Sequence, residues 1–181
     1  MSRLQAWRYL GTRLLFEHPH CRVYEDDVVL PSGLQSGWLR IDDGRDYVKV
    51  ICIDQQGKIL VASQYNHPTR RILHEFPGGQ LHAGESFADA ARRELQEEMG
   101  LYAHQLQELG SFFPNNRRSN IRCGVFIARD FEERPTVLDA EENFAFEWLS
   151  PSEIDQHIAK GEFENGVLLA IWAIYRSHYP A

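Results

Sequence analysis

Three glutamates in the middle of the chain are spaced so that they can hold a divalent cation. Glu94, Glu97 and Glu98 fall within five consecutive residues. At about 100° of rotation per residue, their side chains share one arc of a helix. Like charges on neighbouring turns normally destabilise a helix, whereas clustered carboxylate oxygens suit Mg²⁺ or Mn²⁺. Taken alone, the cluster fits either a metal site or a solvated acidic helix face, which is the more common reason for a run of like charges.

The helix that must carry this cluster is predicted between Ser86 and Gly100. Ser86 is a good N-cap, Asp89 completes a capping pair with it, and Gly100 is the residue type that usually ends a helix. Arg93 can pair with Glu97 four residues on. An adjoining apolar arc that could pack on a sheet is formed by Ala88, Ala91, Leu95 and Met99.

The stretch 79–101 resembles the Nudix box. Its pattern is G-x5-E-x7-R-E-U-x-E-E-x-G-U, where U is apolar, and the chain matches every defined position. A chance match at all of these positions is very improbable, given ordinary residue usage. The flanks are similar to the nucleoside-diphosphate-sugar and ADP-ribose pyrophosphatase branch of the Nudix hydrolases. This resemblance implies an α/β fold, the Nudix α/β/α sandwich with a mixed sheet, plus a small N-terminal antiparallel β-unit.

The resemblance also implies roles at the metal site. Glu94 and Glu98 are expected to be the principal metal ligands, together with the carbonyl oxygen of Gly78. Glu97 is expected to be a further ligand or a general base, and Arg93 is expected to hold Glu97 or a loop carboxyl in place. Glu85 would serve the geometry of the loop, and an outer metal is the other role open to it.

A second candidate for the general base lies in an acidic loop at 139–143. Enzymes similar to this chain use a glutamate of this loop to orient or deprotonate the attacking water. Alignment backwards from Trp148 selects Glu142, with Glu141 as its neighbour. Glu97 and Glu142 remain alternatives for the base.

Substrate contacts are expected from several loops and from the N-terminal region. In the family branch, aromatic side chains of the β-unit stack on the nucleoside base, and Trp7 is a second aromatic candidate or a filler of the unit's small core. The branch commonly has Arg where this chain has Asn66, so nearby arginines could replace that charge or simply face solvent. The candidate substrate-binding residues are Trp38, Arg70, Arg71, Glu75, Arg118 and Asn120.

The N-terminal region is predicted to be a separate β-unit. Short strands are expected over 7–15, 21–30 and 37–41, and such a unit has too little apolar surface to be stable alone. The expected division is 1–44 for this unit and 45–181 for the Nudix hydrolase domain, and the resemblance implies that the unit serves dimerisation and substrate binding. An intrachain flap is the alternative to an intertwined dimer. The later strands are expected over 46–53, 58–65, 72–76, 105–113, 120–129 and 144–149, with further helices from 150 and over 165–177.

Composition limits the partners. A net charge of −7 argues against nucleic acid as a partner. The longest apolar run, 167–174, is too short to span a bilayer, and 1–15 has no secretory signal. Three widely spaced cysteines indicate reduced thiols. We therefore expect a cytoplasmic protein without a nucleic-acid or membrane partner, and the resemblance to the Nudix branch implies a homodimer formed through the N-terminal β-unit and a small-molecule nucleotide substrate.

The expected function is Mg²⁺-dependent hydrolysis of a nucleoside diphosphate sugar, such as ADP-ribose, to a nucleoside monophosphate and a sugar phosphate. Pro114 is followed by Asn, whereas similar enzymes that act on ADP-ribose commonly have Pro-Gly, and this difference weakens the assignment of ADP-ribose as the substrate. One alternative is hydrolysis of nucleoside triphosphates or dinucleotides, although the smallest triphosphatases lack an N-terminal β-unit. A non-enzymatic ligand-binding regulator is another, although such proteins usually lose box carboxylates that this chain keeps.

Overall fold

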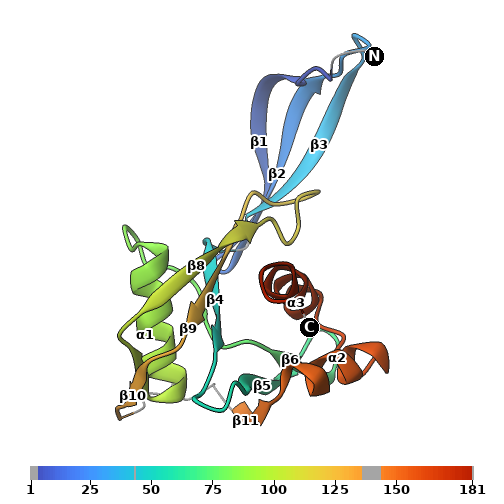
Figure 1. The fold of residues 1–181 in the computed structure, drawn as a ribbon. Helices are drawn as coiled ribbons and strands as arrows, with labels where there is room; N and C mark the ends of the chain where they lie inside the picture. The colour runs from blue at the N-terminus through green and yellow to red at the C-terminus, as the bar shows by residue number, and fades with distance from the viewer. Residues whose placement is uncertain (1–3, 43, 136–143, 181) are drawn as a thin grey trace. The chain divides into compact units, whose positions relative to one another are not determined.

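The computed structural model describes residues 4–42, 44–135 and 144–180 (Figure 1). The chain divides into two compact units. The first consists of Met1–Arg45 and Asn115–Ile121, and the second consists of Asp46–Pro114 and Arg122–Ala181. The first unit therefore takes a short segment from the middle of the chain.

The first unit is a three-stranded antiparallel sheet in the order β1-β2-β3. Its strands are β1 (Arg8–His18), β2 (Cys21–Val29) and β3 (Gln35–Asp42). The segment Asn115–Ile121 is attached to β3, because Ile41 N donates to the Arg118 carbonyl oxygen at 2.7 Å. Arg118 Nη1 in turn donates to the Leu39 carbonyl oxygen at 3.3 Å.

The first unit has almost no hydrophobic core of its own. Among its described residues, Val28 is the one hydrophobic side chain that is buried. Large apolar side chains of β1 are about half exposed instead: Tyr9, Leu10, Leu14, Leu15 and Phe16. So little burial cannot offset the entropy of ordering the chain, and the unit depends on additional surface for its stability.

The second unit combines three small sheets with three helices in the described residues. The sheets have the orders β4-β9-β8, β11-β5-β6 and β10-β7, and β4 and β9 are parallel while the other pairs are antiparallel. The strands are β4 (Tyr47–Cys52), β5 (Ile59–Asn66), β6 (Arg71–Glu75), β7 (Leu101–Ala103), β8 (Leu106–Phe112), β9 (Cys123–Ala128), β10 (Phe131–Glu133) and β11 (Phe144–Leu149). The helices are α1 (Phe87–Met99), α2 (Pro151–Ala159) and α3 (Gly166–His178).

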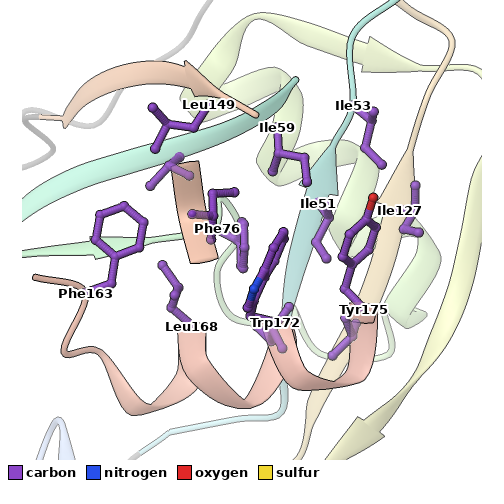
Figure 2. Close-up of a cluster of buried hydrophobic side chains, with 14 of the residues drawn as sticks. Ile51, Ile53, Ile59, Phe76, Ile127, Leu149, Phe163, Leu168, Trp172 and Tyr175 are labelled. Atoms are coloured by element: carbon purple, nitrogen blue, oxygen red, sulfur yellow. The ribbon is translucent and has the colours of Figure 1, made fainter. Parts of the chain in front are cut away.

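Hydrophobic side chains pack on both faces of β4. Ile51 belongs to a cluster with α3 residues such as Trp172, whereas Val48 and Val50 belong to a cluster with α1 residues such as Leu95. Successive side chains of a strand point to opposite faces, which explains the division. Figure 2 shows side chains of α3 directed toward those of β4 and β9 in the first of these clusters. The predicted α/β fold class is confirmed, with helices on both faces of the strands.

Two local features position α1. Its N-cap is Ser86, whose Oγ accepts a hydrogen bond from Asp89 N at 3.1 Å, and its C-cap is Gly100, with a left-handed φ of 63°. The Phe87 ring fills the space above Gly124 of β9, where an added Cβ would lie 2.5 Å from the ring. The helix is thus fixed at its first residue against the sheet, and both predicted caps are present.

Most predicted elements are present with small shifts at their ends. The strand predicted over 120–129 begins only at Cys123, because Arg118 already bonds to β3 and Arg122 N donates to Asp46 Oδ1. The prediction did not include β7 and β10, which are three residues each and pair with one another. In the part of the chain that the structure describes, no helix is long and apolar enough to cross a membrane.

Candidate functional site

A glycine-containing loop runs along β4 as if it were a further strand. Val50 N donates to the Pro77 carbonyl oxygen and Val48 N to the Gly79 carbonyl oxygen, each at 2.9 Å. Leu81 N donates to the Asp46 carbonyl oxygen, also at 2.9 Å. These bonds fix the backbone of residues 77–81 beside the strand, and the box residues follow from there.

Both glycines of this loop stand where a side chain would not fit. Gly78 has a φ of 127°, and a Cβ on it would lie 2.4 Å from the Val48 carbonyl oxygen. A Cβ on Gly79 would lie 2.7 Å from a carboxylate oxygen of Glu94. Glycine therefore allows the backbone to approach both the strand and the acidic residues of α1.

Two of the three box carboxylates on α1 are buried against this loop. Glu94 is 8% exposed and Glu98 is 7% exposed. A carboxylate oxygen of Glu98 accepts a hydrogen bond from Gly78 N at 2.8 Å. Burial raises the pKa of Glu94, and the positive charges of Arg93 and Lys49 act against that rise. Buried carboxylates need compensating positive charge, and here nearby cations already supply part of it.

Arg93 connects the box residues to one another. Its Nε and Nη2 donate to the two carboxylate oxygens of Glu85, each at 2.9 Å. Nη1 donates to Glu94 at 2.7 Å and to Glu97 at 2.9 Å, and Nη2 also donates to the Gln80 carbonyl oxygen at 2.9 Å. The predicted contact with Glu97 is present. The hydrogen bonds from Arg93 hold the pKa of Glu85 at about 2.

The acidic residues fit a hard divalent cation in their chemistry. Glu94, Glu97 and Glu98 supply carboxylate oxygens from one arc of α1, beside a loop whose glycines bring its backbone close to Glu94. In the described residues, no three acidic, histidine or cysteine side chains already surround a space for an ion. Arg93 and the Gly78 N–H occupy oxygens of these carboxylates, so a cation would take over some of their contacts.

One ion pair near the site was not predicted from the sequence. Lys49 Nζ lies 2.9 Å from Glu75 Oε2, and these side chains are only 12% and 20% exposed. Glu75 ends β6, next to the glycine loop. The signal in the sequence was a single lysine within the otherwise apolar strand 47–52.

The other predicted substrate residues lie in different settings. Arg70 and Arg71 are exposed, and Arg71 forms an ion pair with Glu164 at 2.6 Å. Within the first unit, the ring centroids of Trp38 and Trp7 are 5.0 Å apart and nearly perpendicular.

Arg118 also lies beside this aromatic pair, since its guanidinium is 5.7 Å from the Trp38 ring centroid. Asn120, in the same segment, is exposed. Trp38 and Arg118 are therefore brought together within the first unit, whereas Glu75, Gly78 and Arg93 belong to the second. The candidate bases Glu141 and Glu142 lie outside the described residues.

A cavity of about 390 Å³ opens in the second unit at the C-terminal end of α1. Phe131 and Trp148 stack in its wall, with ring centroids 6.1 Å apart. The other lining residues are Leu60, Met99, Gly100, Leu101, Glu133, Arg134 and Phe146. Since Met99 directly follows Glu98, the cavity begins at the residue after the acidic cluster, a feature that spacing in the sequence did not reveal.

Comparison with known proteins identifies relatives over most of the chain. The model of the NUDIX domain matches residues 44–170. An ADP-ribose pyrophosphatase of Bacillus subtilis is 32% identical over 122 residues, covering 66% of this chain and 65% of the relative. An ADP-ribose pyrophosphatase of Mycobacterium tuberculosis is 32% identical over 126 residues, covering 68% of this chain and 61% of the relative. The match thus spans less than two thirds of the length of either relative.

Two further comparisons extend over more of the chain. A methanol dehydrogenase activator of Bacillus methanolicus is 28% identical over 143 residues, which is 79% of this chain and 77% of the relative. The crystal structure of an ADP compounds hydrolase superimposes with a TM-score of 0.86 at 18% identity, covering 98% of this chain and 96% of that structure. This superposition supports the same fold.

Proposed function

The chain belongs to the NUDIX domain family, and from this premise we propose that it hydrolyses the diphosphate bond of a nucleoside diphosphate sugar. The products are a nucleoside monophosphate and a sugar phosphate, and ADP-ribose is the first candidate substrate. One observation carries the proposal: Glu94 and Glu98 are buried beside a loop whose glycines leave no room for a Cβ. Two relatives that are named ADP-ribose pyrophosphatases support the choice of substrate class.

Nudix hydrolases generally use divalent metals, and Mg²⁺ or Mn²⁺ bound here would neutralise phosphate charge and lower the pKa of a bound water. In our proposal Glu94 and Glu98 hold the cation together with the Gly78 carbonyl oxygen. Arg93 positions these carboxylates, and Glu85 anchors Arg93 through two hydrogen bonds.

Glu97 is one of two candidates for the general base. Its side chain is 41% exposed, compared with 11% for Glu94, so it can reach a water at the surface of the cluster. Glu142 is the other candidate, from the loop outside the described residues. Substitution of each by Gln separates them, since the true base gives the larger loss in kcat.

For the nucleoside, we propose that Trp38 stacks on the base. The Trp38 ring already contacts a second tryptophan and the Arg118 guanidinium, a combination that suits a flat, electron-rich ring and a phosphate or sugar hydroxyl. Asn120, Arg70, Arg71 and Glu75 remain candidates for further polar contacts.

We further propose that the protein is a cytoplasmic homodimer formed through the first unit. Apolar side chains of β1 are about half exposed and gain burial only when something covers them. A second copy of the same unit supplies an equivalent apolar surface, as symmetric dimers do. Among the described residues all three cysteines are free thiols, in keeping with a reducing compartment.

The test is a substrate panel assayed with Mg²⁺ and again with excess chelator. The panel contains ADP-ribose, ADP-glucose, UDP-glucose, ATP and a dinucleoside polyphosphate, and the readout is the nucleoside monophosphate released, separated by chromatography. We expect metal-dependent release from a nucleotide sugar and its loss in Glu98→Gln. Faster turnover of ATP or of the dinucleotide would move the substrate class, and no release from any compound would refute hydrolysis.

A further inference from the structure

Lys49 is a charged residue in a largely apolar strand. β4 has the sequence Tyr-Val-Lys-Val-Ile-Cys, and four of its six residues are buried. Lysine is seldom buried unless it is paired, because removing an ammonium group from water is costly. Here the pairing partner is Glu75, with Nζ and Oε2 at 2.9 Å.

The backbone of Lys49 lies directly against the glycine loop. Its neighbours Val48 and Val50 each donate a backbone hydrogen bond to the loop, to the carbonyl oxygens of Gly79 and Pro77. A Cβ on Gly78 would lie 3.1 Å from Lys49 Cα. Residue 49 is therefore the point of β4 over which Gly78 passes.

The side chain of Lys49 reaches the other end of the same loop. Glu75 is the last residue of β6, and the chain continues from it through Phe76 into the glycines. Phe76 is fully buried, so the segment between Glu75 and the glycines is itself anchored in the core. One residue thus contacts the loop through its main chain and the strand before the loop through its ammonium group.

The charge of Lys49 also reaches the acidic cluster. It is one of the positive charges that oppose the burial-driven rise in the pKa of Glu94. Arg93 contacts the box carboxylates directly, whereas Lys49 acts on Glu94 through space. The site therefore contains two cations of different kinds, and the second lies outside the box.

We propose that Lys49 is a positioning residue for the metal site. Through its ion pair with Glu75, it holds residues 76–79, at the start of the glycine loop, in the place where Gly78 and the carboxylates of α1 can bind one divalent cation. This inference rests on the proposed function for the identity of the bound ion. In this proposal Lys49 acts through Glu75 and the loop, and not by contacting the substrate or the cation. An ion pair that served only to stabilise the fold would change the melting temperature and leave metal binding alone.

The test compares Lys49→Met, Lys49→Arg, Glu75→Gln and the double variant Lys49→Met/Glu75→Gln. Methionine is an unbranched side chain only one atom shorter than lysine, and it carries no charge. Lys58→Met, at an exposed lysine before β5, is the matched control. Mn²⁺ binding is measured without substrate by electron paramagnetic resonance, and kcat and KM are then measured with the best nucleotide substrate.

We expect Lys49→Met to weaken Mn²⁺ binding by about tenfold and to lower kcat by about tenfold, the range typical of groups that orient metal ligands. KM for the nucleotide should change by less than about threefold, because the proposal assigns Lys49 and Glu75 to holding the loop; a larger rise in KM would assign Glu75 to the substrate and overturn the proposal. Lys49→Arg should retain most of the Mn²⁺ affinity. The double variant should be no worse than Glu75→Gln, since two residues that act through one interaction are not additive.

If Lys49→Met binds Mn²⁺ as tightly as the wild-type protein and differs only in a lower melting temperature, the ion pair is only structural. Additive losses in the double variant would show that Lys49 does not act through Glu75. If the wild-type protein binds Mn²⁺ but hydrolyses no nucleotide, the proposed function fails and the binding comparison still decides the role of Lys49. If the wild-type protein binds no Mn²⁺ but releases a nucleoside monophosphate with Mg²⁺, the proposal for Lys49 is overturned and the proposed function stands.

Discussion

Arg93 determines how the acidic residues are arranged. A single guanidinium donates to three carboxylates and to one backbone carbonyl oxygen, and its side chain is 19% exposed. Partly buried carboxylates that lose such a partner are left with uncompensated charge. The geometry of the box therefore depends on this residue as much as on the glutamates themselves.

Arg93→Met should separate the carboxylates and leave Glu85 and Glu94 without their main partner. We expect a loss of at least about tenfold in kcat and a fall of about 2 kcal/mol in the free energy of unfolding, the scale of a broken charged hydrogen-bond network. Kinetics and urea denaturation measure the two effects. Arg92→Met is the control, since Arg92 only approaches the exposed Asp89 at 3.6 Å. Equal losses in the two variants would contradict the role of Arg93.

The same contact predicts how stability depends on pH. The pKa of Glu85 falls from 4.5 to about 2 in the folded protein, chiefly because Arg93 donates to its carboxylate. A depressed folded-state pKa stabilises the fold above the unfolded pKa, and this contribution is lost as the pH falls through the folded pKa. We expect the free energy of unfolding to decline between about pH 4.5 and pH 2 for this reason. Glu85→Gln should flatten the decline in denaturation curves; a parallel decline in both proteins would assign it to other groups.

At the scale of residues, the sequence identified the metal candidates because their types and spacing alone place them on one arc of α1. Glu94 and Glu98 could be selected as metal-ligand candidates without knowledge of the fold. The contact of Arg93 with Glu97 followed from helix geometry, whereas its bonds to Glu85 depend on how the preceding loop folds back. Lys49 and Glu75 are 26 positions apart, so their pairing required the tertiary structure.

The candidate metal site depends on the glycine loop and α1 together. Gly79 stands so close to Glu94 that the two cannot accommodate a methyl group between them. The loop is also bonded to β4, so it cannot move away freely. A change in the loop should therefore displace the carboxylate rather than the strand.

Gly79→Ala is expected to lower kcat by about tenfold or more, because a displacement of about 1 Å at a reacting group is enough for such losses. The change in melting temperature should be small, since the Glu94 side chain can move aside. Gly166→Ala at the start of α3 is the control, as no atom lies within 4 Å of its added Cβ. A Gly79→Ala protein with the kcat of the Gly166→Ala protein would rule out this steric role.

At the scale of elements, local signals gave the reliable predictions. Ser86 and Gly100 mark the ends of α1 through interactions within a few residues, and the capping box at Ser150 starts α2 in the same way. By contrast, β7 and β10 are each three residues long and exist because they pair with one another. No periodicity develops over three residues, so such strands cannot be recognised before the chain is folded.

At the scale of the whole molecule, the first unit is expected to hold two copies of the chain together. We predict a homodimer at micromolar concentration by analytical ultracentrifugation. Leu15→Glu and Phe16→Asp, at half-exposed positions of β1, should shift the protein toward the monomer because a charge would have to be buried in the interface. Ile72→Asp, at an exposed position of the second unit, should leave the mass unchanged. A monomeric wild-type protein would remove the dimer proposal.

The sequence predicted an N-terminal β-unit but not its full membership. The segment Asn115–Ile121 reads as a polar loop, and part of it was predicted to be strand. Its attachment to β3 joins residues almost 80 positions apart through Ile41, Arg118 and Leu39. Contacts of such sequence separation leave no mark in local composition, which is why the segment was not assigned to this unit.

This attachment means that the first unit is not a detachable module. The chain passes between the two units three times, after Arg45, after Pro114 and after Ile121. A protease that cleaves after Arg45 releases the amino-terminal fragment only if the hydrogen bonds between β3 and the segment Asn115–Ile121 also break. Conversely, a shortened protein that starts at Asp46 keeps the segment Asn115–Ile121 but lacks β3, the strand to which this segment bonds.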